Sequence, residues 1–330
     1  MGIFDAISSK ISSLWAVKPR EFQEMLDVGH ACMLTCLRKE LSKIDASSNQ
    51  ARAKAVDKVT EQVEKLGFSE QQNLVQQNLT EQMQKMFEVL HAARSDIHLL
   101  TANATSQFLG PESENSNEDA LADMKDESNE MVLDLIREKM GFCLRVKDSK
   151  IHGAGEGVFV NGMAEMGDVV AIYPGYVHLR EHLRDGDYVR ALFPDENFFL
   201  FTRYDSVCID GRTVEEQPSN EFGLGHMVNH PPKNMEPNVI AMAYNFVDDS
   251  KTGPTSIPKD LRYLIPNTYF KPPTLLGTPD LSILMQCVVY ISTRRIEDEE
   301  MLINYRFNPK FQVPEWYHHV DDEQAKRRWA

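Results

Sequence analysis

Apolar side chains in residues 3–15 recur three and four positions apart, with serines and lysines between them. This spacing predicts an amphipathic helix at the start of the sequence. Such a helix either docks on a folded domain or lies weakly on a membrane surface. Docking is favoured because its polar face offers only Lys10 and Lys18, whereas helices on membrane surfaces are richer in basic residues.

A helical period also runs through residues 20–105, which are predicted to form a small helical bundle. Ser69 and Gln72 have the spacing of a capping box, so we expect a long third helix to start there. The helical apolar positions of the three expected helices cover 22–44, 51–66 and 79–97.

The segment 111–130 has a different composition, with eight acidic residues and one lysine among serines and asparagines. A stretch of this kind buries too little apolar surface to fold alone. It therefore predicts an acidic linker, which we extend over 106–130.

Beyond the linker, a short helix is expected at 131–140, closed by Gly141, and the pattern then changes to short β-like runs separated by Gly and Pro. We therefore expect an α+β protein. Its parts are a helical module at 1–105, the acidic linker at 106–130, a β-rich domain at 131–312 and a tail at 313–330. The strongest strand candidates are 158–160, 169–173, 198–204, 207–209, 239–246 and 283–292.

Composition narrows the choice of partner and compartment. The net charge of −15 argues against direct binding of nucleic acid, because phosphate contacts need clustered Lys and Arg, and it suits a basic protein partner. The five cysteines are scattered and never spaced C-x-x-C, so neither a disulfide framework nor a metal site is predicted. No apolar run approaches the ~20 residues that span a membrane, and the start lacks the pattern of a secretory signal. We expect an intracellular protein of the cytoplasm or the nucleus.

Four short motifs follow one another in the β-rich half. The first is a glycine-rich turn, Gly153–Gly157, that leads into a strand and not into a helix, so it does not predict a phosphate cradle. After it come Tyr173-Pro-Gly, then Asn229-His230 with Pro237-Asn238, and finally Glu299–Tyr305. In this order the motifs resemble those of the SET-domain family, which has G-x-G, Y-x-G, an asparagine-histidine pair followed by P-N, and E-E-L-x-x-D/N-Y.

The resemblance implies a function: transfer of a methyl group from S-adenosylmethionine to a lysine side chain of a protein substrate. It implies a SET fold with a threaded C-terminal segment. The implied catalytic residues are Tyr305, near the reacting amine, and Tyr173, along the lysine channel. Displacement at a sulfonium depends mainly on alignment, so no metal is implied. The implied cofactor-binding residues are Gly155, Glu156, Gly157, Asn229 and His230.

Three features depart from the family pattern. His226-Met227 stands where the family has R-F, Pro231-Pro232 stands where it has Ser-Cys, and no cysteine follows Tyr305 in this sequence to bind the family's zinc. Closure of the site is then expected from 311–316 or from another segment. Two interpretations stay open: an active lysine methyltransferase, and an inactive SET-fold binding or scaffold module that acts through protein partners. In either, the helical half is a candidate adaptor.

Overall fold

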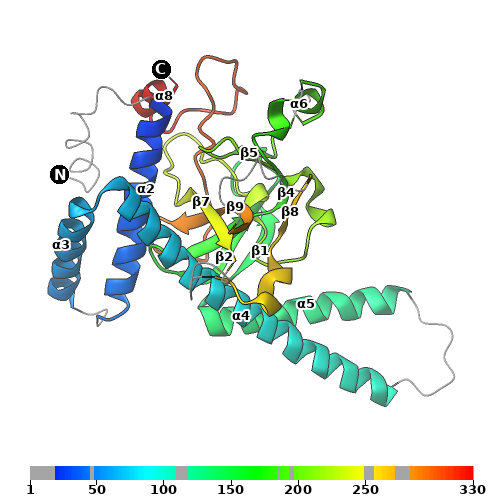
Figure 1. Ribbon diagram of the computed structural model, residues 1–330. Helices are drawn as coiled ribbons and strands as arrows, with labels where there is room; N and C mark the ends of the chain where they lie inside the picture. Colours follow the sequence, from blue (N-terminus) through cyan, green and yellow to red (C-terminus); the bar gives the residue numbers. More distant parts are fainter. Residues whose placement is uncertain are drawn as a thin grey trace.

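Long helices lie against three small β-sheets in the computed structural model (Figure 1). The expected class, α+β, is confirmed. The structure describes residues 19–44, 48–108, 118–184, 186–192, 197–248, 256–271 and 282–329. The amphipathic helix expected at 3–15 lies outside these residues.

The three helices expected in the first half are present, with shifted ends. They are α2 (Pro19–Leu41), α3 (Asn49–Lys65) and α4 (Phe68–Phe108). The expected Ser69-Gln72 capping box is wrong, because the helix starts earlier. The carboxylate of Glu70 instead accepts a 2.7 Å hydrogen bond from the amide of Gly67, just before the helix.

The described part of the acidic segment, residues 118–130, is helical where a linker was expected. Helix α5 (Glu118–Met140) begins well before residue 131 and forms a hairpin with α4 that extends beyond the sheets (Figure 1). Its residues Val132 and Ile136 are buried, and Arg145 holds Glu130 at 2.5 Å. Once packing starts a helix, each further residue is cheaper to add, so the helix continues into a sequence that would not fold alone.

The β-rich half forms three sheets, with strand orders β1-β2-β10, β3-β9-β7 and β5-β6-β4-β8. All neighbours are antiparallel except β4 and β8, which are parallel. Each strand candidate from the sequence is confirmed in place, whereas β1, β4, β8 and β10 were not predicted. The strands are β1 (Phe142–Asp148), β2 (Glu156–Ala164), β3 (Val169–Tyr173), β4 (Gly175–His178), β5 (Leu200–Thr202), β6 (Cys208–Asp210), β7 (Val239–Val247), β8 (Asn267–Tyr269), β9 (Ile283–Ser292) and β10 (Ile296–Glu297).

Short helices fill the connections between strands and end the described chain. They are the 3₁₀ turns η1 (His182–Arg184), η2 (Gly211–Glu216), η3 (Gly225–Met227) and η4 (Lys259–Leu264), with α6 (Gly186–Leu192) and the C-terminal α8 (Asp322–Arg328).

Helix α4 covers backbone groups of the sheets with two glutamine side chains. Gln76 donates to the carbonyl of Asn245 on β7 at 2.7 Å and accepts from its amide at 3.2 Å. Gln82 likewise donates to the carbonyl of Gly167 at 3.1 Å and accepts from the amide of Val169 at 2.9 Å. Each side-chain amide bonds as a neighbouring strand would, one on the β7 edge and one on the β3 edge of the sheet, so these edge backbone groups have partners.

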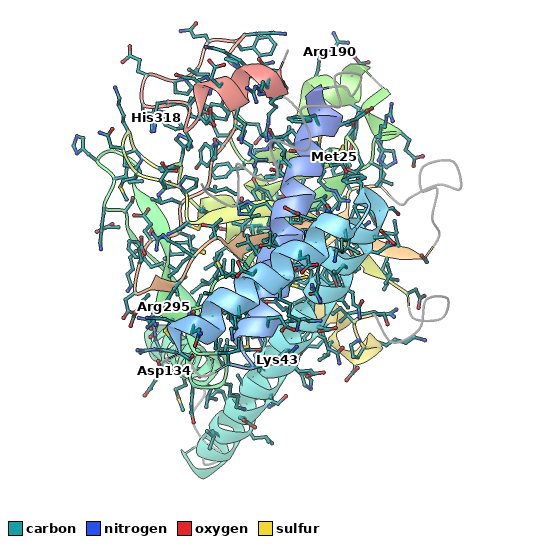
Figure 2. The ribbon with its side chains drawn as sticks, turned by 90° about the vertical axis from the view of Figure 1, so that its left-hand side faces the viewer. Met25, Lys43, Asp134, Arg190, Arg295 and His318 are labelled. Carbon is teal, nitrogen blue, oxygen red and sulfur yellow. The ribbon has the colours of Figure 1, made fainter. Side chains whose placement is uncertain are left out.

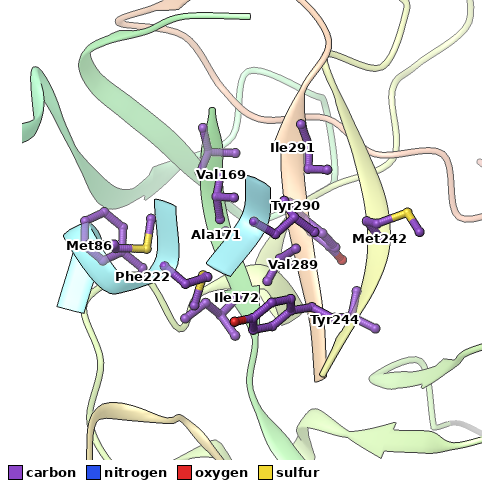
Figure 3. Close-up of a cluster of buried hydrophobic side chains, with 14 of the residues drawn as sticks. Met86, Val169, Ala171, Ile172, Phe222, Met242, Tyr244, Val289, Tyr290 and Ile291 are labelled. Carbon is purple, nitrogen blue, oxygen red and sulfur yellow. The ribbon is translucent and has the colours of Figure 1, made fainter. Parts of the chain in front are cut away.

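Helices and sheets share one continuous hydrophobic core. Figure 3 shows Met86 of α4 beside Ile172 of β3 and Phe222, with Tyr244 and Tyr290 on the neighbouring strands. The hydroxyl groups of Tyr244 and Thr80 lie 3.1 Å apart, which joins β7 to α4 by a buried polar contact. The helical half is thus an integral layer of the fold.

We predict that Gly167→Ala destabilises the protein far more than Gly153→Ala. Both glycines have left-handed φ values, +85° and +79°, so each substitution costs about 1–2 kcal/mol of backbone strain. At Gly167 the new Cβ would also overlap the carbonyl oxygen of Leu34 on α2, which adds about 1–3 kcal/mol, whereas nothing lies within 4 Å at Gly153. Urea denaturation of both variants measures the difference; equal losses would contradict the close approach of α2 to this turn.

Candidate functional site

The segment 299–303 lies at the centre of the site, because it bonds to β2 on one side and to the segment 229–239 on the other. It thereby brings the glycine turn, the asparagine-histidine pair and Tyr305 together. The backbone bonds are Val160 N to Glu299 O at 3.0 Å, Met301 N to Val158 O at 2.8 Å, Ile303 N to Asn229 O at 2.9 Å and Asn238 N to Leu302 O at 3.0 Å.

Glu300 is the hub of this arrangement, and its carboxylate is buried, with the residue only 5% exposed. It accepts hydrogen bonds from the hydroxyl of Ser149 at 2.7 Å, the amide of Lys150 at 3.2 Å and Nδ2 of Asn229 at 3.0 Å. A buried charge is tolerated when donors surround it in this way. In the sequence, Glu300 is visible only as one position of the Glu299–Tyr305 motif. Side chains alternate in direction along an extended segment, so one of the two adjacent glutamates must point inward, and this was the signal that could have found it.

The glycine turn has a closed side and an open side. A Cβ on Gly157 would overlap the Glu300 carboxylate and lie 2.9 Å from Nδ2 of Asn229, so only glycine fits there. Gly155 has a φ of +71°, and nothing lies within 4 Å of its Cβ position. The carbonyl of Glu156 accepts a 2.9 Å bond from Asn229, while its side chain is exposed. The turn is therefore fixed from inside and open to a ligand from outside.

His230 is buried, and both of its ring nitrogens are bonded. Nδ1 accepts from the amide of Tyr305 at 3.3 Å, and Nε2 donates to the carbonyl of His318 at 2.9 Å. These partners place the ring proton on Nε2. Burial lowers the pKa of His230 to about 4, so the ring is neutral at physiological pH.

Three tyrosines lie close together beside this cluster. Tyr305 donates its hydroxyl to the carbonyl of Val228 at 3.1 Å, and Tyr173 donates to the carbonyl of Phe199 at 2.8 Å. The rings of Tyr173 and Tyr290 lie 6.4 Å apart. Tyr290, on β9, is a site residue that the sequence did not reveal, because it stands within an apolar strand.

Burial raises the pKa of all three tyrosines, to about 12 for Tyr305. Their hydroxyl groups therefore stay protonated at neutral pH. They can orient a polar group and enclose it with aromatic rings. Because they are protonated, they cannot act as general bases.

An aromatic cluster from the C-terminal segment covers His230 and Tyr305. The ring centroid of His230 lies 4.5 Å from that of Tyr317, and Trp316 lies 6.1 Å from Tyr305. Phe307 stacks on Tyr317 at 4.7 Å. Of the segment 311–316 expected to close the site, Trp316 takes part, whereas Phe311 is 73% exposed. Among the described residues, no cluster of His, Cys, Asp or Glu could hold a metal ion.

The departures from the family pattern have clear places in the structure. Burial lowers the pKa of His226 to about 4, and its ring lies 6.2 Å from Phe199. Pro231-Pro232 leads into an exposed turn, in which the amide of Met235 donates to the carbonyl of Pro232 at 3.0 Å. The chain re-enters the core at Asn238, which is 0% exposed and donates to the carbonyl of Glu300 at 2.8 Å.

No protein-family model and no curated protein matches the chain. Among solved structures, it is similar to ctPRC2 in an autoinhibited conformation bound to S-adenosylmethionine, with 13% identity, a TM-score of 0.30 and 52% of this chain covered. It is also similar to KRYPTONITE in complex with mCHH DNA, an H3(1–15) peptide and SAH, with 18% identity, a TM-score of 0.30 and 53% covered. The matches span 16% and 25% of those two chains. In the part of this chain that the structure describes, no helix is long and apolar enough to cross a membrane.

We predict that Glu300→Ala lowers the free energy of unfolding by about 2–4 kcal/mol, because it leaves three donors without their acceptor. Its neighbour is the matched control: Glu299 pairs with Arg294, and both side chains are at least one-third exposed, so Glu299→Ala costs about 0.5 kcal/mol. Chemical denaturation compares the two variants. Similar losses would show that Glu300 is not the hub.

The stability of the protein should also depend on pH through His230. The folded-state pKa of His230, about 4, lies below the 6.5 of an exposed histidine, so the unfolded chain takes up the proton first as the pH falls. Its contribution to stability is complete above pH 6.5 and is lost between pH 6.5 and 4, at up to about 1.4 kcal/mol per pH unit. His230→Gln should reduce that slope in denaturation curves recorded from pH 7 to 4.5. An unchanged slope would mean that the folded protein already binds this proton.

Proposed function

We propose that this protein is a SET-type methyltransferase that transfers a methyl group from S-adenosylmethionine to a lysine of a protein substrate. One observation carries the proposal: the segments that bear Gly155–Gly157, Asn229-His230 and Tyr305 meet through bonds to Glu300 and His230. The net charge of −15 favours a basic substrate protein.

In this proposal the glycine turn and the asparagine-histidine pair hold the cofactor. The open side of Gly155 lets a ligand approach the backbone closely. The side chain of Asn229 makes two hydrogen bonds with the described part of the chain, and Nδ2 donates both of them. Its Oδ1 can therefore accept a bond from the ammonium group of S-adenosylmethionine. The cofactor supplies the activated methyl group.

The tyrosines prepare the lysine for attack. Only a neutral amine can displace a methyl group from a sulfonium, yet free lysine has a pKa of ~10.4. A channel walled by Tyr173, Tyr290 and Tyr305 desolvates the amine and favours its uncharged form. The Tyr305 hydroxyl, with a pKa of about 12, acts as a fixed dipole that aligns the nitrogen with the methyl group.

We also propose the bounds of the domain, its threaded segment and a narrower resemblance. Residues 131–312 form the SET domain, and the segment 299–303, held between β2 and 229–239, belongs to its threaded C-terminal part. A narrower resemblance to SET domain-containing protein 9 rests on 207–211, 261–266 and 290–297.

One observation favours the alternative, a SET-fold binding module without turnover. His230 is bonded at both ring nitrogens by residues of its own chain, and Tyr317 packs on its ring. If the C-terminal segment keeps this position permanently, the ring offers nothing to a cofactor, and the protein acts through its partners.

Isothermal titration with S-adenosylmethionine tests cofactor binding. We expect binding by the unaltered protein and affinity at least about tenfold weaker for Asn229→Ala, since a buried polar contact is worth about 1.4 kcal/mol or more. Asn73→Ala, at an exposed position on α4, is the control and should bind normally. If the folded protein gives no heat of binding, the methyltransferase proposal is wrong and the SET-fold binding module remains.

Transfer of tritiated methyl groups to a lysate tests turnover. Tyr305→Phe should bind the cofactor normally but lose about 10²-fold in rate, because it lacks the aligning hydroxyl. Tyr263→Phe removes an equivalent hydroxyl, which is bonded to His91 at 2.9 Å on an exposed surface, and should transfer normally. Equal rates for the two variants would exclude Tyr305 from catalysis.

A further inference from the structure

Asp27 of α2 is buried at a point where three parts of the chain meet. Its carboxylate binds both terminal nitrogens of Arg306, at 2.5 and 2.9 Å. It also accepts from the hydroxyl of Tyr204 at 2.5 Å and from Gln23 at 3.0 Å. Arg328, from the C-terminal helix α8, approaches to 3.8 Å. Figure 2 shows α8 and the stretch bearing His318 at the same end of the molecule as the start of α2.

Arg306 directly follows Tyr305 and has an unusual backbone. Its φ is +56°, in the left-handed region that residues other than glycine rarely adopt. Such a conformation persists only where the surroundings impose it. Here the amide of Arg306 donates to Oδ1 of Asn304 at 3.0 Å, and its side chain is clamped by Asp27.

The clamp is an ion pair. Burial acts against the charge on Asp27, but Arg306, followed by Arg328 and Tyr204, outweighs it and keeps the pKa of Asp27 below its usual range. A two-pronged bond between a planar guanidinium and a carboxylate fixes direction as well as distance. The turn that carries Tyr305 is therefore held from α2, and not only from the β-rich half.

We propose that Asp27 is a positioning residue for Tyr305, through which α2 sets the geometry of the catalytic segment. This inference rests on the proposed function for the role of Tyr305, but the contact itself does not. It makes the helical half part of the catalytic unit, where the sequence suggested an adaptor.

Hydrogen exchange tests the contact without any need for activity. Asp27→Asn should speed exchange at the amide of Tyr305, which is bonded to Nδ1 of His230, by at least about tenfold, with little change in β3 or β9. Asp168→Asn is the matched control, because it weakens a different ion pair of α2, in which Arg38 of the helix binds Asp168 in the turn before β3. It should leave the Tyr305 amide unchanged. Equal acceleration in both variants, or acceleration spread over the whole chain, would overturn the proposal.

Kinetics tests the consequence. Asp27→Asn should lower kcat at least about tenfold while the Kd for S-adenosylmethionine changes less than twofold, and Asp168→Asn should change neither. Asp27→Asn combined with Arg306→Gln should be no slower than Arg306→Gln alone, since both act through one contact. A loss of kcat matched by an equal loss of folded protein would overturn positioning.

The two proposals fail separately. If the unaltered protein neither binds S-adenosylmethionine nor transfers methyl groups, the proposed function is wrong. The exchange comparison then still decides whether Asp27 fixes residue 305.

Discussion

The buried carboxylate of Glu300 is the interaction on which the rest of the site depends. A charge in the interior needs donors, and its three donors come from Ser149, Lys150 and Asn229, two of them at the entry to the glycine turn. The carbonyl of the same residue holds Asn238. One residue thus fixes the turn, the asparagine-histidine pair and the segment 299–303 that leads to Tyr305.

The helical layer provides the second constraint. Gln76 and Gln82 bond to sheet backbone as strands would, and the carboxylate of Asp27 reaches the residue after Tyr305. The segment that bears Tyr305 is therefore held between Glu300 on the β-rich side and Asp27 on the helical side. Aromatic rings from Phe307, Trp316 and Tyr317 pack over His230 and Tyr305.

Periodicity predicted the long helices and the main strands, because apolar spacing is a local signal. It did not predict the helix from Glu118, where packing on α4 overrides an acidic composition. The motifs predicted Asn229 and Tyr305, but not Glu300, Tyr290 or Asp27, since a glutamate beside a second glutamate, a core tyrosine and a helix aspartate look ordinary in sequence. The bond between Asp27 and Arg306 joins positions 279 residues apart, which no local pattern encodes.

Hydrogen exchange with and without S-adenosylhomocysteine, the demethylated product, tests the central claim most directly. The account predicts slower exchange in three separate stretches at once, around Gly155, Asn229 and Tyr305, and little change in α3, which lies outside the proposed site. Protection in none of these stretches, in a folded protein at saturating ligand, would contradict a cofactor site built on Glu300.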